Sequence, residues 1–146
     1  RERLSVNYSQ RGWHLGAKVQ GSYNRMTGQR SDFKEISAWD YSYGLTARLP
    51  LPGKVGLSTD FTVFSRRGYT DTQLNTNHFI WNLRLERSIL HGNLTFALDG
   101  FDLLHELSNV TRTVNAQGRT ETYHNVIPSY FMLHAIYKFN LSPKTR

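Results

Sequence analysis

Apolar and polar residues alternate along most of this chain with a period of two, the spacing of side chains on opposite faces of a β-strand. The alternation recurs seven times and predicts strands over residues 3–9, 13–24, 38–49, 54–64, 78–88, 93–101 and 130–140. In the last strand, one face holds Phe131, Leu133, Ala135, Tyr137 and Phe139. None of these segments has the 3.6-residue period of a helix. The fold class is therefore predicted to be all-β.

The connections between these strands alternate in length. Short turns rich in Gly are expected at 9–12, 50–53 and 89–92, and long polar loops at 25–38, 65–77 and 102–128. All the long loops then emerge at one end of an antiparallel, up-and-down sheet. Within the last loop, two Thr-rich arms over 110–123 predict a small hairpin of its own, which lacks an apolar face.

A soluble antiparallel sandwich also alternates in this way, so three further features are needed to identify the environment. The strands expected over 13–24, 38–49 and 54–64 each alternate for about ten residues, long enough to cross a bilayer at a tilt. The loops are sorted by length, as in transmembrane barrels. The aromatic residues of the apolar face are expected in two bands, with Tyr8, Trp13, Tyr137 and Phe139 towards the short turns and Tyr23, Trp39, Phe64, Phe79 and Phe131 towards the long loops. Together these features favour a transmembrane β-barrel whose apolar face contacts lipid.

The opposite face is rich in charged and amide side chains and is expected to line a wet lumen. Its members are His14, Lys18, Gln20, Asp40, Arg48, Lys54, Asp60, Asn82, Arg84, Glu86, Asp99 and Lys138. Asp60, Glu86 and Asp99 are expected to pair with Arg48, Arg84 and Lys54, or to contact a plug inside the lumen. Because bacterial single-chain barrels have an even number of strands, seven main strands predict that residues 1–146 are the C-terminal part of a larger barrel. A self-contained eight-stranded barrel, with one strand drawn from 105–124, is the alternative.

The composition excludes several other classes. The chain has 146 residues and no cysteine, which removes disulfides and thiolate metal sites. It has no run of about 18 apolar residues, the length that a transmembrane helix requires. Its net charge of +7 comes from 18 basic residues scattered among 11 acidic ones, which does not indicate a nucleic-acid partner. The first ten residues contain no apolar core of a signal peptide.

The stretch "NLTFALDGFDLLHELSNVTRTVNAQGRTETYHNVIPSYFMLHAIYKFN" (93–140) resembles the C-terminal end of TonB-dependent receptor barrels, an outer membrane β-barrel protein family. The matching features are "DGFDLL", "SNVTRTVN", "IPSY" and the ending "YKFN". The resemblance implies a bacterial outer-membrane location and a 22-stranded barrel. It also implies a plug and a TonB-contacting segment, both outside these residues. Such a receptor imports a nutrient ligand of the siderophore, cofactor or oligosaccharide class.

The resemblance also implies what the closing strand does. Tyr137 and Phe139 match the aromatic positions of the C-terminal signal that the barrel-assembly machinery reads. The tail "LSPKTR" departs from the pattern, because the aromatic residue is terminal in many such proteins. The remaining expected partners are outer-membrane lipid and lipopolysaccharide.

Catalysis, cofactors and metals are not expected. "HELSN" (105–109) approaches the zinc-protease pattern H-E-x-x-H, but its fifth position is Asn109. The basic residues of the long loops, Arg66, Arg67, Arg112 and Arg119 above all, are expected to meet phosphates of lipopolysaccharide or an anionic ligand at the outer surface. Ordinary solvated loops are the alternative interpretation of these arginines.

Two other functions fit the same pattern. The first is a complete small outer-membrane barrel that acts as a structural anchor or adhesin. The second is a soluble, lipocalin-like protein that holds an apolar ligand behind its aromatic face.

Overall fold

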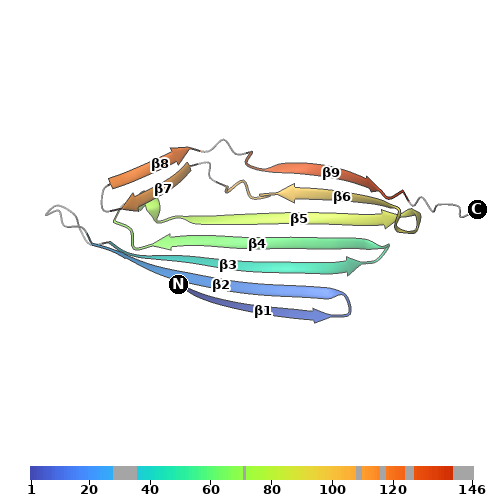
Figure 1. Cartoon of the computed structure of the whole chain (residues 1–146), viewed down its shortest axis with the longest axis horizontal. Helices are drawn as coiled ribbons and strands as arrows, with labels where there is room; N and C mark the ends of the chain where they lie inside the picture. Colours follow the sequence, from blue (N-terminus) through green and yellow to red (C-terminus); the bar gives the residue numbers. More distant parts are fainter. Residues whose placement is uncertain (28–35, 71, 108–109, 116–117, 124–126, 140–146) are drawn as a thin grey trace, which may run out of the picture.

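The fold is a single antiparallel sheet of seven strands with a separate two-stranded hairpin (Figure 1). The computed structural model describes residues 1–27, 36–70, 72–107, 110–115, 118–123 and 127–139. The strands of the main sheet are β1 (Glu2–Gln10), β2 (Trp13–Met26), β3 (Ile36–Leu51), β4 (Val55–Arg67), β5 (Asn77–Ile89), β6 (Leu94–Phe101) and β9 (Tyr130–Tyr137). The hairpin is formed by β7 (Val110–Asn115) and β8 (Gly118–Tyr123), and two 3-10 turns are η1 (Thr72–Leu74) and η2 (Leu90–Gly92).

The order of strands in the main sheet is β1-β2-β3-β4-β5-β6-β9, and every neighbouring pair is antiparallel. The predicted seven-stranded, up-and-down sheet is thus confirmed. Strands β3 and β4 extend two to three residues beyond their predicted limits at the long-loop end, to Ile36 and Arg67. In the described part of the chain no helix is long and apolar enough to span a membrane.

The short turns all lie at one end of the sheet, at the right of Figure 1. The first contains only Arg11 and Gly12, with φ angles of 50° and 85°. Two consecutive residues with positive φ form the turn whose twist matches the twist of the strands that it joins. The second turn places Gly53 at φ 81° and Lys54 at φ 59°.

The strand ends are staggered, and the stagger is regular. His14 pairs with Arg48, so β3 continues two residues beyond the level at which β2 begins. Val55 pairs with Arg87, so β5 again continues two residues beyond the level at which β4 begins. The level of the short turns therefore shifts along the strands by two residues for every two strands, which is one residue per strand. With about 3.4 Å per residue and about 4.8 Å between strands, turns at a common depth require a strand tilt of about 35°. This is the tilt at which sheets close into barrels.

The main sheet is one layer thick, so neither of its faces is covered by a second sheet of the described residues. The buried hydrophobic side chains of the described residues are Ala38, Tyr69, Leu74 and Ala97, most of them near the long-loop end or under a loop. In contrast, the apolar face is open along its length, and Leu133 is 73% exposed. A face of this kind needs an apolar environment that the described residues do not provide.

The hairpin predicted over 110–123 is confirmed, since β7 and β8 pair only with each other. It lies at the long-loop end of the sheet (Figure 1). Neither of its strands joins the main sheet as an eighth strand. As a result, the outer edges of β1 and β9 have no partner strand among the described residues.

Candidate functional site

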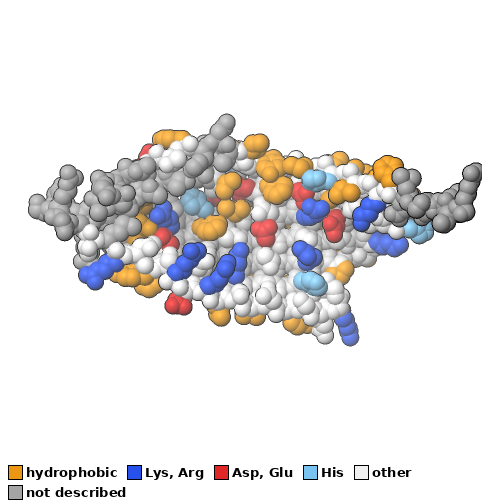
Figure 2. Space-filling view, in the orientation of Figure 1, with side chains coloured by type: hydrophobic (Ala, Val, Ile, Leu, Met, Phe, Trp, Pro, Cys, Tyr) orange, Lys and Arg blue, Asp and Glu red, His pale blue; other side chains and the backbone are white. Residues whose placement is uncertain are grey.

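Charged side chains gather on one face of the main sheet, hereafter the polar face, which Figure 2 shows from the front. The strand register aligns five of its residues in one row across five strands. This polar row consists of His14, Arg48, Ser58, Arg84 and Asp99. Alternation on each strand keeps the polar row on one side, while the apolar neighbours of its members point to the other.

Asp99 is the most enclosed member of the polar row, at 5% exposed. It accepts a hydrogen bond from Arg84 Nη1 at 3.4 Å, and His134 Nε2 of β9 lies 2.8 Å from its Oδ2. Arg84 Nε also lies 3.4 Å from Glu86 Oε2. The predicted pairing of these carboxylates with Arg84 is therefore confirmed.

Asp60 departs from this expectation. Its Oδ2 accepts from Asn82 Nδ2 at 3.0 Å, an amide rather than one of the expected cations. Arg48 makes no ion pair with any described side chain. A guanidinium with no carboxylate beside it is available to an anionic group in the lumen.

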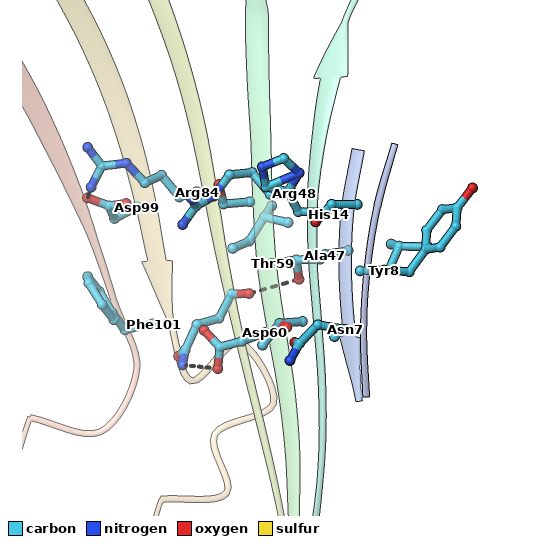
Figure 3. Close-up of a pocket in the computed structure, with 17 residues that line it drawn as sticks. Asn7, Tyr8, His14, Ala47, Arg48, Thr59, Asp60, Arg84, Asp99 and Phe101 are labelled. Atoms are coloured by element: carbon cyan, nitrogen blue, oxygen red, sulfur yellow. Dashed lines mark hydrogen bonds and ion pairs between the residues drawn. The ribbon is translucent and has the colours of Figure 1, made fainter. Parts of the chain in front are cut away.

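A hollow of about 620 Å³ lies on the polar face, towards its short-turn end (Figure 3). Its polar lining comes from β1 to β6 and includes Asn7, His14, Thr46, Arg48, Ser58, Asp60, Asn82, Arg84 and Asp99. In Figure 3, Tyr8 points away from the charged side chains, towards the other face. The hollow thus offers donors and acceptors of both charges to a hydrated ligand or a polar protein segment.

A tight turn after β6 borders this face, and Asp102 holds it in place. Asp102 is 3% exposed, and its carboxylate accepts the backbone N–H groups of Glu106 and Leu107 at 3.2 and 2.8 Å. Its own N–H donates to Asn82 Oδ1 at 2.9 Å. Asn82 therefore connects this turn to Asp60 on β4. These hydrogen bonds explain the second aspartate of the "DGFDLL" sequence, Asp102, as the residue that holds the turn.

A second cluster lies at the long-loop end of the polar face, centred on Asp40. Its carboxylate accepts from Asn24 Nδ2 at 2.8 Å, Arg66 Nε at 3.2 Å and the Tyr69 hydroxyl at 3.1 Å. The Arg66 guanidinium also lies 4.6 Å from the centre of the Tyr69 ring. Tyr69 is 5% exposed and fastens the loop between β4 and β5 to the sheet. No period-two pattern marks Tyr69, because it lies in a loop.

The other face, hereafter the membrane face, is apolar along its centre and carries charges only towards strand ends. Counted twelve residues from the short-turn end of each strand, β2 to β5 place Arg25, Trp39, Arg67 and Asn77 at one level. At the other end Arg87 lies level with Val55. Glu2 is the acidic residue on this face and lies on the edge strand β1.

The structure separates two arginines that the sequence grouped together. Arg66 pairs with Asp40 on the polar face, whereas Arg67 pairs in register with Trp39 on the membrane face. Phe64 was expected in the outer aromatic band of the membrane face, and this is wrong. It pairs with Ser42 and His78, which are on the polar face, because β4 alternates without interruption from Val55.

The remaining predicted residues can be placed as follows. Phe131, Leu133, Ala135 and Tyr137 alternate along β9 and pair with Gly100, Leu98, Phe96 and Leu94 of the membrane face. Phe139 follows β9 and contacts Tyr137, with ring centres 4.5 Å apart. The side chains of Arg112 and Arg119 lie outside the described part of the structure. The described residues contain no group of three or more His, Asp or Glu side chains able to hold a metal ion.

A family model described as "Outer membrane protein beta-barrel family" matches residues 3–137, nearly the whole main sheet. No curated protein and no solved structure matches the chain.

Proposed function

Since the chain belongs to the outer membrane protein β-barrel family, and so to the outer membrane, we propose that it forms part of the wall of a TonB-dependent transporter. The transporter would import a nutrient ligand of the siderophore, cofactor or oligosaccharide class. In this proposal the sheet is wall and binding surface, and it catalyses no reaction. Its partners are further barrel strands, a plug, TonB through other parts of the protein, and the barrel-assembly machinery.

The observation that carries the proposal is the charged hollow on the polar face. An eight-stranded barrel has an interior just wide enough to be filled by its own side chains. Here Arg48 and the other residues of the polar row face a hollow of about 620 Å³ that other described residues do not fill. Barrels of 22 strands enclose a plugged lumen, which supplies a polar surface to such a wall.

The unpaired edges of β1 and β9 also support a larger barrel. A sheet edge cannot face hydrocarbon, because its N–H and C=O groups would lack hydrogen-bond partners. β7 and β8 pair with each other and leave both edges open. The self-contained small barrel, which would need an eighth strand from this region, is therefore less well supported.

Growth of the source bacterium on single nutrients tests the proposal. The panel consists of iron–siderophore complexes, cobalamin and starch oligosaccharides, each supplied at limiting concentration. Deleting the gene for this protein and deleting the gene for TonB are expected to abolish growth on the same nutrient. Arg48→Gln in the intact protein is expected to weaken uptake of that nutrient while the protein remains in the outer membrane.

A matched control is Lys138→Gln, which removes a charge beyond β9 and outside the hollow. A deletion strain that grows normally on every nutrient, or a growth defect that is independent of TonB, contradicts transport. Either result would leave the outer-membrane location intact, since that rests on the family.

A further inference from the structure

Arg67 occupies an unusual position for a cation. It lies at the last position of β4, on the membrane face, twelve residues from Val55 at the short-turn end. At a tilt of about 35°, twelve residues span about 33 Å along the membrane normal. The hydrocarbon core is about 30 Å thick, so Arg67 lies at the level of the outer head groups. At this depth a charge on the membrane face costs far less than it does at the midplane.

The Arg67 guanidinium is held in place by neutral groups. Nη2 donates to Asn77 Oδ1 at 2.9 Å, and Nη1 donates to the backbone oxygen of Arg66 at 2.8 Å and to that of Thr76 at 3.5 Å. An arginine has five N–H donors, so two remain for another acceptor. No described carboxylate neutralises Arg67, whereas Asp40 neutralises Arg66 one residue earlier. Arg67 is thus a fixed cation with no anionic partner among the described side chains.

Aromatic side chains continue from Arg67 across the same level. Trp39 is its register partner, and the Trp39 ring lies 4.9 Å from Tyr23 and 6.2 Å from Tyr41, centre to centre. Arg25 belongs to the same level on β2. Amphipathic rings beside cations are typical of the boundary between head groups and acyl chains. Glu2 is three strands from β4, about 14 Å away, and so does not cancel the charge of Arg67.

An apolar hollow of about 520 Å³ lies below this level on the membrane face. Leu45, Phe61 and Trp81 form its upper rim. Its other side chains lie two to five residues from the short-turn ends of their strands, and they include Tyr8, Leu15, Ala17, Ala47 and Thr59. Phe61 is six residues below Arg67, about 17 Å along the membrane normal at this tilt. That is about half the thickness of the hydrocarbon core. One amphiphile can therefore meet Arg67 with its head group and the upper rim of the apolar hollow with a chain.

We propose that Arg67, with Trp39 and the upper rim of the apolar hollow, binds a phosphorylated glycolipid of the outer leaflet, with Arg67 holding a phosphate group. The anionic head group supplies a counter-charge that the described residues do not, and the acyl chain covers the upper rim of the hollow. The inference rests on the outer-membrane location and holds whether or not the barrel transports a nutrient. It also distinguishes Arg67 from Arg66 at the end of β4, because only Arg67 faces the lipid.

The test measures lipopolysaccharide that co-purifies with the intact protein when outer membranes are extracted in mild detergent. One interfacial cation contributes about five-fold to the binding of an anionic lipid. Arg67→Gln is therefore expected to retain about one-fifth of the lipopolysaccharide per protein at sub-saturating lipid. Arg67→Lys keeps the charge and is expected to stay within about two-fold of the unchanged protein.

Two controls separate lipid binding from folding. Arg87→Gln removes a cation from the same face at the opposite leaflet, where lipopolysaccharide is absent, and is expected to have no effect. Asn77→Ala removes a bond that fixes Arg67 but leaves the charge, so the lipid should remain within about two-fold. A structural role for Arg67 predicts instead that Asn77→Ala loses as much lipid as Arg67→Gln.

The identity of the bound group is tested with purified lipid A that carries both phosphates and with the same lipid A after enzymatic dephosphorylation. Native mass spectrometry of the protein with each lipid is expected to show the phosphorylated form bound about five-fold better, and this preference lost in Arg67→Gln. Equal binding of the two lipids by the unchanged protein would overturn the proposal. So would an Arg67→Gln protein that co-purifies with the full amount of lipopolysaccharide.

Discussion

The assignment of the two faces can be tested on β9 with a pair of adjacent substitutions, Leu133→Arg and Met132→Arg. Leu133 is 73% exposed on the membrane face and Met132 is 42% exposed on the polar face. Both therefore accept a long side chain without a steric clash from a second layer. The register places Met132 beside Asp99, which favours a cation there.

The expected magnitudes follow from depth. Leu133 is four residues from Tyr137 at the end of β9, which is about 11 Å along the membrane normal at a tilt of 35°. The apolar band of a bacterial barrel is about 25 Å tall, so Leu133 lies close to its midplane. An arginine there is expected to lower the free energy of unfolding by about 2–4 kcal/mol. An arginine at position 132 enters the wet lumen and should change it by less than about 1 kcal/mol.

The measurement is equilibrium unfolding of the intact protein in phospholipid vesicles by urea, followed by tryptophan fluorescence. The three tryptophans of this chain, Trp13, Trp39 and Trp81, all lie on the membrane face, where they report contact with lipid. If Met132→Arg destabilises the protein as much as Leu133→Arg does, the two faces are wrongly assigned. The same conclusion follows if Leu133→Arg is neutral.

Two further substitutions test the clusters at the ends of the polar face. Asp102→Ala removes the acceptor of two backbone N–H groups. It is expected to lower the free energy of unfolding by about 2–4 kcal/mol and to speed protease cleavage within 103–107. Glu106→Ala is the control, because it leaves both hydrogen bonds of the turn in place. Tyr69→Phe removes the hydroxyl that donates to Asp40. It is expected to lower the free energy of unfolding by about 1–2 kcal/mol and to increase protease cleavage of the loop between β4 and β5. Tyr43→Phe on the membrane face is the control and should change neither quantity. Unchanged cleavage in both variants would show that these bonds do not hold the loops.

Alternation was sufficient to predict the sheet because a strand between lipid and water has only two environments, and each residue reports one of them. Strand count, turn positions and the small hairpin could all be read from this signal. The prediction failed for Phe64 because this residue was assigned to a face by its aromatic side chain and not by its position in the alternation along β4. Val63 and Ser65 on either side of Phe64 show the correct face.

The clusters could be predicted only in part, because they depend on which strands are neighbours. Arg84 and Asp99 are close in the register of β5 and β6, and this pairing of adjacent strands was within reach of the sequence. Tyr69 comes from a loop and meets Asp40 across 29 residues of chain, so no local pattern indicates the contact. Arg66 and Arg67 are adjacent in sequence, yet the alternation of side chains along β4 places Arg66 on the polar face and Arg67 on the membrane face.

The two candidate binding surfaces differ in how far they depend on the rest of the barrel. Among the described residues β9 pairs on one side only, so its eight residues leave about eight backbone groups facing outwards, each costing several kcal/mol in hydrocarbon. This exceeds the net stability of a typical protein, so the larger barrel proposed above requires neighbouring strands at both edges of the sheet. The polar hollow extends to the edge strand β1 and faces the lumen, so what it binds depends on the strands that lie beyond β1 in the proposed barrel. Arg67 and its partners Trp39 and Asn77 come from β3 to β5, within the interior of the sheet, so strands added at the edges leave the head-group contact unchanged. The lower part of the apolar hollow reaches Val6 and Tyr8 of β1, so this part depends on the next strand.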